Sequence, residues 1–121
     1  GSYRREIDAV AAAAELDLRR FAPVLGSDMY APWKPDPAGL LRAAAELGVA
    51  PDRIAVLEDS PSGLLAAERA GTTPVHIAEF AGPPPRDATA IAPHTYPTIA
   101  AFVADLTARR RTRRTSTRSA R

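Results

Sequence analysis

The sequence predicts an α/β fold in which a parallel β-sheet is flanked by helices. Three observations carry this prediction: helical segments rich in Ala and Leu alternate with short apolar runs, the connections between them are short, and Gly or Pro marks most boundaries. This alternation is typical of parallel strands joined by right-handed helical crossovers. Because ligands of such sheets bind beyond the carboxyl ends of the strands, the residues that follow each strand are the candidates for function.

The N-terminal part predicts a helix and then a short strand. Tyr3 to Leu18 is rich in Ala, Leu and Glu, and four apolar residues of this segment share one helical face: Ile7, Val10, Ala14 and Leu18. The apolar run from Phe21 to Leu25 ends at Gly26-Ser27-Asp28, which is typical of a short buried strand followed by a loop.

The central part carries the clearest helix boundaries. Asp36 places a capping carboxylate directly before Pro37 at the first helical position, and Gly48 ends the alanine-rich run between them. A second helix is expected to begin at Ser60-Pro61 and to stop at Gly71.

Two apolar runs flank this second helix and predict strands. Ile54 to Leu57 is continuous and apolar, as expected for a parallel strand buried on both faces, and it is followed at once by Glu58 and Asp59. Pro74 to Ile77 predicts the next strand.

The C-terminal part predicts little regular structure. AGPPPRD, which follows the last strand, should interrupt regular structure, and Thr98 to Leu106 predicts a short helix. Beyond it the chain consists almost entirely of Arg, Thr and Ser. We therefore expect a core domain at residues 1–106 and a basic, disordered tail at residues 107–121.

Length and composition limit both the class of protein and the kinds of metal site. At 121 residues, with 45% hydrophobic and 25% charged residues, the chain falls in the range of a single soluble domain. It has no apolar run near the ~20 residues of a membrane span and no secretory leader, so we expect a soluble, cytoplasmic protein. Because cysteine is absent, only oxygen and nitrogen ligands are available to a metal.

The net charge of +2 combines two regions of opposite sign. Seven arginines and no acids lie in residues 107–121, whereas nine basic and all 14 acidic residues precede them, so the body carries −5 and the tail +7. A tail of this kind supports one alternative function, a non-catalytic protein that binds nucleic acid or another polyanion. It has no aromatic residue to stack on bases, and we do not expect nucleic acid as a partner.

Two adjacent carboxylates, Glu58 and Asp59, form the most informative pair. They lie where a predicted strand meets a helix. Magnesium prefers oxygen ligands and takes one or two carboxylates together with waters and phosphate oxygens. The pair is therefore a candidate magnesium site, while the alternative is that Asp59 faces solvent or caps the following helix.

Lys34 is the second candidate, because it lies in a WKPDP context where prolines restrict the backbone around it. A lysine fixed in this way can hold phosphate as a point charge. The alternative is an ordinary solvated lysine on a loop.

The segment KPDPAGLLRAAAELGVAPDRIAVLEDSPSGLLAAERAG resembles the third and fourth motifs of the haloacid dehalogenase-like hydrolase superfamily. It is most similar to the sugar-phosphatase and beta-phosphoglucomutase-like branch, and the likeness is clear from about Phe21 to Ile77. The resemblance implies the C-terminal half of a Rossmann-like core. It also implies a magnesium-dependent phosphatase or phosphomutase that acts on a small phosphorylated metabolite through an aspartyl-phosphate.

The resemblance also implies roles for individual residues. Lys34 matches the catalytic lysine that binds phosphate and stabilises the phosphoaspartyl intermediate, and Glu58 with Asp59 matches the acidic pair that positions magnesium. Ser60 and Gly63 match the ordered turn after that pair.

Other parts of the family pattern are missing. The family requires an N-terminal DxD motif that supplies the nucleophile and the general acid, and these 121 residues contain none. Asp28 matches a non-catalytic loop acid and is interpreted as structural, while Ser2 lies near the position of the second-motif Ser or Thr and is a candidate phosphate ligand. Family sheets have the strand order 5-4-1-2-3, of which this chain would supply only the third, fourth and fifth. We therefore expect the chain to be inactive alone.

Three further residues are weighed and given no role. His76 is expected within a strand and His94 within a loop. Trp33 would either line the entrance for the substrate or cover the core, and we favour the second interpretation.

Overall fold

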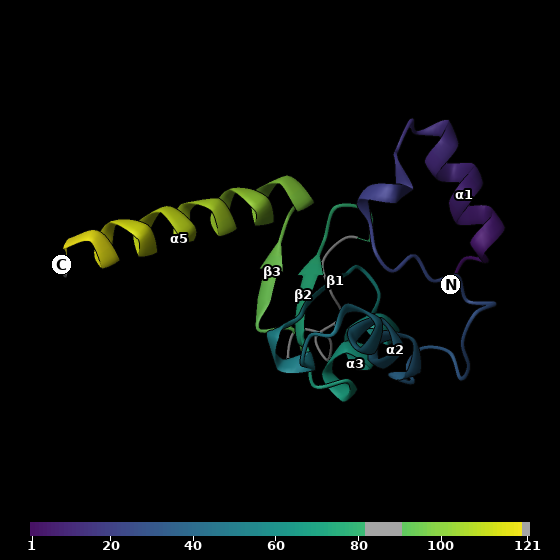
Figure 1. Cartoon of the computed structure of the whole chain (residues 1–121). Coiled ribbons are helices and arrows are strands. Elements are labelled where there is room, and N and C mark those ends of the chain that lie inside the picture. Colours follow the sequence, from purple (N-terminus) through teal and green to yellow (C-terminus); the bar gives the residue numbers. More distant parts are fainter. Residues whose placement is uncertain (82–90, 120–121) are drawn as a thin grey trace.

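The structure is a computed structural model that describes residues 1–81 and 91–119 (Figure 1). Its centre is a parallel sheet with the strand order β1, β2, β3, formed by Ala55–Glu58, Thr73–Ile77 and His94–Tyr96. Ala55 is paired with Thr73, and Val75 with His94. This arrangement confirms the predicted α/β fold with a parallel sheet and flanking helices.

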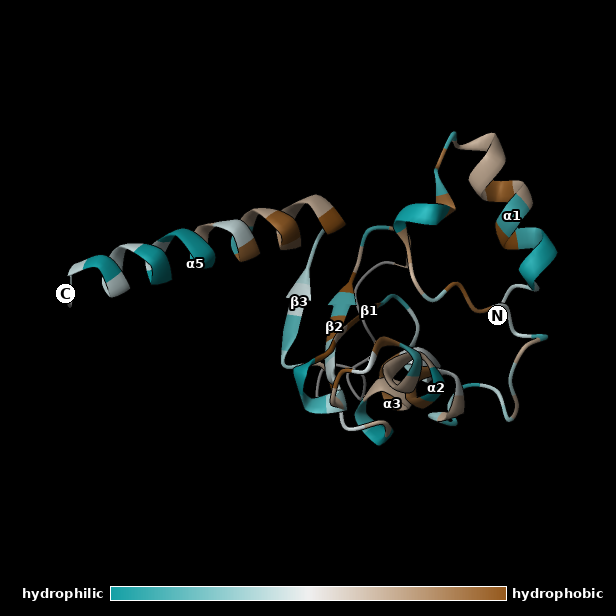
Figure 2. Cartoon of the chain, viewed as in Figure 1, coloured by the Kyte–Doolittle hydropathy of each residue, from teal (hydrophilic) through white to brown (hydrophobic). Residues whose placement is uncertain are grey.

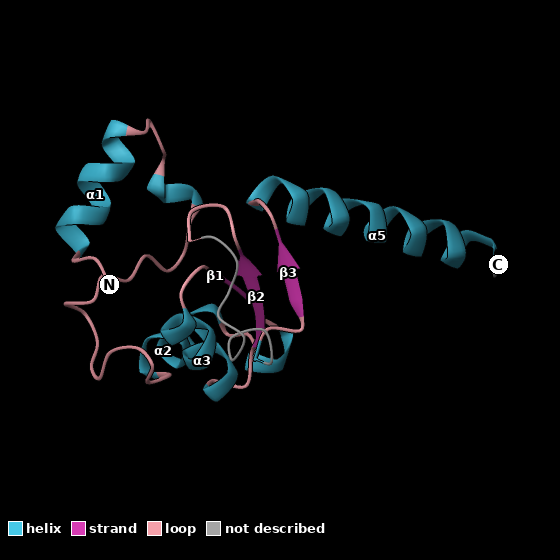
Figure 3. Cartoon of the chain, turned by 180° about the vertical axis from the view of Figure 1, so that it is seen from behind, coloured by secondary structure: helices cyan, strands magenta, loops and turns pink. Residues whose placement is uncertain are grey.

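The helices are distributed around this sheet. They are α1 (Arg4–Ala13), α2 (Ala38–Leu47), α3 (Pro61–Arg69) and α5 (Ile99–Ser119), with short 3-10 turns η1 (Leu18–Arg20) and η2 (Pro51–Arg53). Figure 1 and the reverse view in Figure 3 show α2 and α3 together beside the sheet, α1 at one end of the molecule and α5 projecting from the other. In the part of the chain that the structure describes, no helix has both the length and the apolar character needed to cross a membrane.

The predicted boundaries of α2 and α3 agree closely with the structure. The Asp36 carboxylate accepts a hydrogen bond from the Ala38 amide at 2.9 Å, and Gly48 ends the helix in the left-handed conformation with φ 64°. Ser60 caps α3 by accepting from the Gly63 amide at 3.2 Å. These hydrogen bonds fix where the loops before α2 and α3 end.

The core lies between α3 and the sheet. Leu64 on α3 is fully buried and packs with Ala92 and the half-buried Ile91. Val75 and His76 of β2, the central strand, are 3% and 1% exposed. His76 is thus a strand residue, as predicted, and among the described residues its Nδ1 has no hydrogen-bond partner.

The expectation that the strand before Glu58 is buried on both faces is wrong. In β1 the exposed Ala55 and Leu57 alternate with the half-buried Val56 and Glu58. Successive side chains of a strand point to opposite faces of the sheet, so the face of β1 that carries Ala55 and Leu57 is open in the described fold, whereas Glu58 on the other face lies against Gly63 of α3.

The first predicted helix is shorter than expected. α1 ends at Ala13 and not at Leu18, because Glu15 adopts a left-handed conformation with φ 54°. The amides of Glu15 and Leu16 turn back to the carbonyls of Ala12 and Ala11, which closes the helix as a Schellman motif.

The strand predicted at Phe21 to Leu25 is not formed. A strand requires a neighbour to accept and donate its backbone hydrogen bonds, and the described residues provide none beside this segment. Pro23 also lacks an amide hydrogen. The segment is instead irregular, with bends at Phe21 and Ala22, and its Val24 carbonyl accepts from the Arg4 guanidinium at 2.9 Å.

Two predictions for the C-terminal part are wrong. His94 begins β3 and does not lie in a loop, because its backbone pairs with Val75 of β2. The helix predicted to end at Leu106 continues as α5 to Ser119, so the described part of the expected disordered tail is helical. Arginine favours helices, and the Thr hydroxyls of this segment are satisfied by backbone carbonyls one turn back, such as Thr112 to Ala108 at 3.1 Å. Most of AGPPPRD lies outside the described residues.

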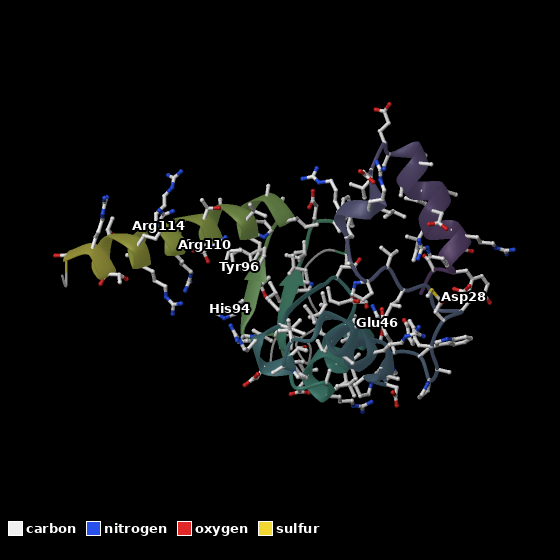
Figure 4. All side chains as sticks on the ribbon, viewed as in Figure 1. Asp28, Glu46, His94, Tyr96, Arg110 and Arg114 are labelled. Atoms are coloured by element: carbon white, nitrogen blue, oxygen red, sulfur yellow. The ribbon has the colours of Figure 1, made fainter. Side chains whose placement is uncertain are left out.

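Only the beginning of α5 packs on the sheet. The rings of Tyr96 and Phe102 meet edge to face at 5.4 Å, and the Tyr96 hydroxyl donates to Asp105 at 2.5 Å. Figure 2 shows the first turns of α5 as apolar and the rest as hydrophilic, and Figure 4 places Arg110 and Arg114 on the projecting part.

Deleting residues 107–121 should leave the unfolding midpoint nearly unchanged. Residues 107–119 are exposed throughout, and the ion pair lost with Arg109, to Asp105, is itself largely exposed. We expect a shift of less than about 4 °C by differential scanning calorimetry. A decrease of more than about 10 °C would show that this part of α5 packs on the body.

Candidate active site

A cleft of about 630 Å³ opens at the carboxyl end of β1. This volume is in the range of small-molecule sites. The walls come from the loop before α2, the end of β1, the start of α3 and the N-terminal residues. Lys34, Glu58 and Asp59, the three main candidates from the sequence, all line this cleft.

The Glu58 carboxylate is held from several directions. Nζ of Lys34 donates to its Oε1. The Ser60 hydroxyl donates to Oε2 at 3.0 Å, and the Ser60 amide approaches the same oxygen at 3.4 Å. Gly63 lies directly against the carboxylate, and a Cβ at that position would displace it from this place. Glu58 is therefore a fixed, 12% exposed carboxylate that orients the lysine.

Asp59 differs from its neighbour because it is exposed to the cleft. Within residues 1–81 and 91–119 it makes no ion pair. Its charge is felt by Lys34, since partial burial lowers the pKa of the lysine and the charge of Asp59 opposes this shift. One carboxylate is thus engaged with the lysine, and the other is open to a ligand.

The donor set fits magnesium better than a metal that needs a full protein cage. The described residues contain no cluster of three or more His, Asp or Glu side chains that could enclose a metal. Magnesium does not require one, because it keeps several waters and takes one or two carboxylates with phosphate oxygens. Asp59 alone, or Asp59 together with Glu58, has the right chemistry for that mode of binding.

The N-terminal segment closes the other side of the cleft. The buried Ser27 donates its amide hydrogen to the Ser2 carbonyl at 2.9 Å. Gly1 and Tyr3 line the cleft, so Ser2 lies between two lining residues, and its role as a phosphate ligand stays a prediction. The Asp28 carboxylate accepts from the Arg4 amide at 2.8 Å at the start of α1. This contact agrees with a structural role for Asp28.

Aromatic residues complete the cleft: Trp33, for which this position was the less favoured interpretation, and Tyr3 and Tyr30, which the sequence did not predict there. Trp33 is 60% exposed and lines the cleft, so the interpretation that it covers the core is wrong. The chain folds sharply at this loop, and the Trp33 Nε1 donates to the Ser27 carbonyl at 2.7 Å. Tyr30, Ser27 and Ser62 also line the cleft without having been predicted. Only the position of Trp33 beside Lys34 gave a signal in the sequence.

Residues 1–71, more than half of the chain, match the family of haloacid dehalogenase-like hydrolases. The chain belongs to this family. The matched residues include the Lys34 loop, β1 with its two carboxylates, and α3. The family resemblance of the sequence is thereby confirmed, and hydrolase is the class of enzyme to which it points.

A curated relative is a phosphatase. Over 38 residues the chain is 53% identical to validoxylamine A 7'-phosphate phosphatase from Streptomyces hygroscopicus subsp. limoneus. The aligned part covers 31% of this chain and 18% of that protein.

Solved structures show the same fold. A conserved haloacid dehalogenase-like protein of unknown function from Agrobacterium tumefaciens superimposes with a TM-score of 0.75 at 29% identity, over 88% of this chain and 51% of that one. A hydrolase from Pseudomonas syringae gives a TM-score of 0.69 at 26% identity, over 79% of this chain and 45% of that one. The chain thus spans about half the length of these solved relatives.

Proposed function

We propose that this cleft binds the phosphate group and the magnesium ion of a phosphatase that acts on a small phosphorylated metabolite. One observation carries the proposal: a loop lysine and two carboxylates, 24 residues apart in the sequence, converge in one cleft at the carboxyl end of a parallel strand. The phosphatase among the relatives supports the type of reaction.

Lys34 binds the phosphate group in this proposal. Phosphoryl transfer depends on positioning and on neutralising charge that develops on the phosphate oxygens. Nζ of Lys34 is held at the mouth of the cleft by Glu58, so its positive charge is already in place before a phosphate arrives. The backbone on both sides is restricted by Pro32 and Pro35.

Asp59 holds magnesium directly in this proposal, and Glu58 acts through Lys34 and Ser60. The exposed carboxylate has room for a hydrated ion, whereas the Glu58 oxygens are already occupied by protein donors. Bound magnesium would supply charge neutralisation at the phosphate oxygens.

The nucleophile comes from residues outside these 121 in this proposal. The chain contains no DxD motif, and the solved relatives are about twice as long as the part that it matches. Transfer through an aspartyl-phosphate would then take place in a protein that combines this chain with such a motif. Release of inorganic phosphate identifies a phosphatase, whereas recovery of an isomeric phosphate ester identifies a phosphomutase.

Replacing Asp59 with Asn in the enzyme that contains the DxD motif should raise the magnesium concentration for half-maximal activity by more than about 100-fold. Glu58→Gln should raise it by about tenfold, because a residue that only orients a ligand costs less than the ligand itself. Both values come from phosphate release measured against magnesium concentration.

Asp52→Asn is the matched control, because Asp52 is an exposed carboxylate in η2, before the opposite end of β1. It should behave as the wild type. Equal magnesium dependence in the Asp59 and Glu58 variants and the wild type would remove the metal site from the proposal.

A further inference from the structure

We propose that the arginine-rich part of α5, residues 107–119, binds the phosphate backbone of double-stranded DNA without regard to base sequence. This surface is separate from the cleft, because none of the residues that line the cleft belongs to α5. The inference therefore does not depend on the proposed function.

The arginines of this part of α5 lie on one side of the helix. At 3.6 residues per turn they fall within an arc of about 200°, and the remaining circumference carries Thr, Ser and Ala. The arginine face consists of Arg109, Arg110, Arg111, Arg113, Arg114 and Arg118, with Thr107 and Thr117 between them. A shallow hollow on this face is lined by Arg113, Arg114, Thr117 and Arg118. The helix thus has a positively charged side and a neutral side.

The guanidinium groups of the arginine face are open to a partner. Within residues 1–81 and 91–119, Arg109 alone among them makes an ion pair, with Asp105 at 3.0 Å. Residues 107–119 are exposed throughout. The threonine hydroxyls are already used by the backbone, as where Thr117 donates to the Arg113 carbonyl at 2.8 Å. A guanidinium offers five N–H donors in a fork that matches phosphate, so this face is suited to a polyphosphate.

The body of the protein anchors this helix without covering it. The Tyr96 ring packs against Phe102, and the Tyr96 hydroxyl donates to Asp105, which fixes the first turns of α5 on the sheet. From residue 107 to residue 119 the helix extends about 18 Å further, which is about two Debye lengths at physiological salt. The body carries −5. A polyanion can therefore meet the arginine face with little repulsion from the body.

The shape of the arginine face favours B-form DNA. An α-helix with its side chains is about 10–12 Å wide, and the major groove of B-form DNA, about 12 Å wide, admits it. An arginine face that spans about 200° can contact phosphates on both sides of the groove, while the neutral side stays in water. The major groove of A-form RNA is too narrow for this arrangement.

Single strands and membranes each require a feature that this helix lacks. Single strands bind largely through bases stacked on aromatic side chains, and residues 107–119 contain none. A helix that lies in a membrane surface needs an apolar face, and Ala108 is the only apolar residue in this part of the sequence. Phosphate contacts to a duplex need neither feature. The lack of aromatic residues therefore argues against a single strand and not against duplex DNA.

Anisotropy of a fluorescent DNA duplex of about 20 base pairs and mixed sequence tests the proposal on the full chain. We expect a Kd of about 10 μM or tighter at about 50 mM salt. The logarithm of the binding constant should fall with the logarithm of the salt concentration with a slope of about −4 to −5, as for five neutralised phosphates. Deleting residues 107–121 should abolish binding. A full chain that does not bind, or a truncated chain that binds equally well, would overturn the proposal.

Paired substitutions separate the arginine face from net charge. Arg113→Gln with Arg114→Gln should weaken duplex binding at least about tenfold and make the salt slope shallower by about 2. Arg20→Gln with Arg53→Gln is the matched control, because it removes the same charge from exposed positions in η1 and η2. This control should stay within about twofold of the wild type. Equal losses in the two pairs would show that binding follows net charge alone and would contradict the assigned surface.

A helix-breaking variant tests whether the helical arrangement of the arginines matters. The wild-type chain should bind duplex DNA at least about fivefold more tightly than a single strand of equal length, duplex RNA or phosphatidylserine vesicles. Thr112→Pro keeps every arginine but interrupts α5, and it should lose this preference, whereas Thr112→Ser should keep it. Equal or tighter binding of another partner, or an unchanged preference in Thr112→Pro, would overturn the DNA assignment. A salt-sensitive dimer in sedimentation without DNA binding would assign the arginine face to a second copy of the chain instead.

Discussion

Replacing Lys34 with Ala should lower kcat by about 100- to 1,000-fold in the enzyme that contains the DxD motif. Lys34 is the positively charged side chain that lines the cleft, and Glu58 holds it in position. Its loss therefore removes an interaction that strengthens as charge develops in the transition state. Steady-state phosphate release at saturating substrate measures the effect, and activity within about threefold of the wild type would contradict the assigned role.

The same substitution has a smaller effect on stability that must be separated from catalysis. Without Lys34, the Glu58 carboxylate keeps its Ser60 contacts but loses the opposite charge while remaining 12% exposed. The double variant Lys34→Ala, Glu58→Gln removes that unpaired charge. It should recover stability in thermal unfolding without recovering kcat, because only the folding defect arises from the carboxylate.

The second large effect is the absence of catalysis in the chain alone. The described cleft can hold phosphate and magnesium, but these 121 residues supply no DxD nucleophile and no general acid for the leaving group. On a panel of small phosphomonoesters with magnesium, phosphate release by the chain should match that of its Lys34→Ala variant. Turnover that depends on Lys34 would mean that another residue acts as the nucleophile, and Asp28 would be the first to test.

Sequence reasoning succeeded where the structure depends on local signals. The Ser60 side chain accepts a hydrogen bond from an amide in the first turn of α3, and Gly48 adopts the left-handed conformation that ends α2. Both signals act within a few residues, so these boundaries could be predicted from the local sequence. The apolar strands β1 and β2 were also found, because their runs are short and bounded.

Sequence reasoning failed where the local structure depends on a distant segment or on an unusual backbone conformation. The end of α1 depends on Glu15 in a left-handed conformation that glycine normally occupies, and no glycine marked it. Phe21 to Leu25 has strand-like composition but lacks a neighbouring strand in the described fold. α5 continues past Leu106 without the apolar periodicity that would have revealed it.

The candidate site was predicted by motif resemblance more than by geometry. Nothing local in the sequence indicates that Lys34 reaches Glu58, since they are separated by all of α2. The place of Trp33 and Tyr30 in the cleft could not be decided from the sequence, because it depends on the contact of Trp33 with the Ser27 carbonyl and of Tyr30 with Gly39. Such contacts arise only when the loop before α2 is folded.

Restoring a DxD segment to this chain tests the central claim most directly. The segment is supplied as a separate polypeptide or as an N-terminal extension taken from the gene, and phosphate release from small phosphomonoesters is measured with and without magnesium. We predict activity only in the combined protein, only with magnesium, and with both Lys34 and Asp59 required. A folded, combined protein that remains inactive on a broad panel, or that is active without Lys34 and Asp59, would contradict the proposal that this cleft is half of a phosphatase site.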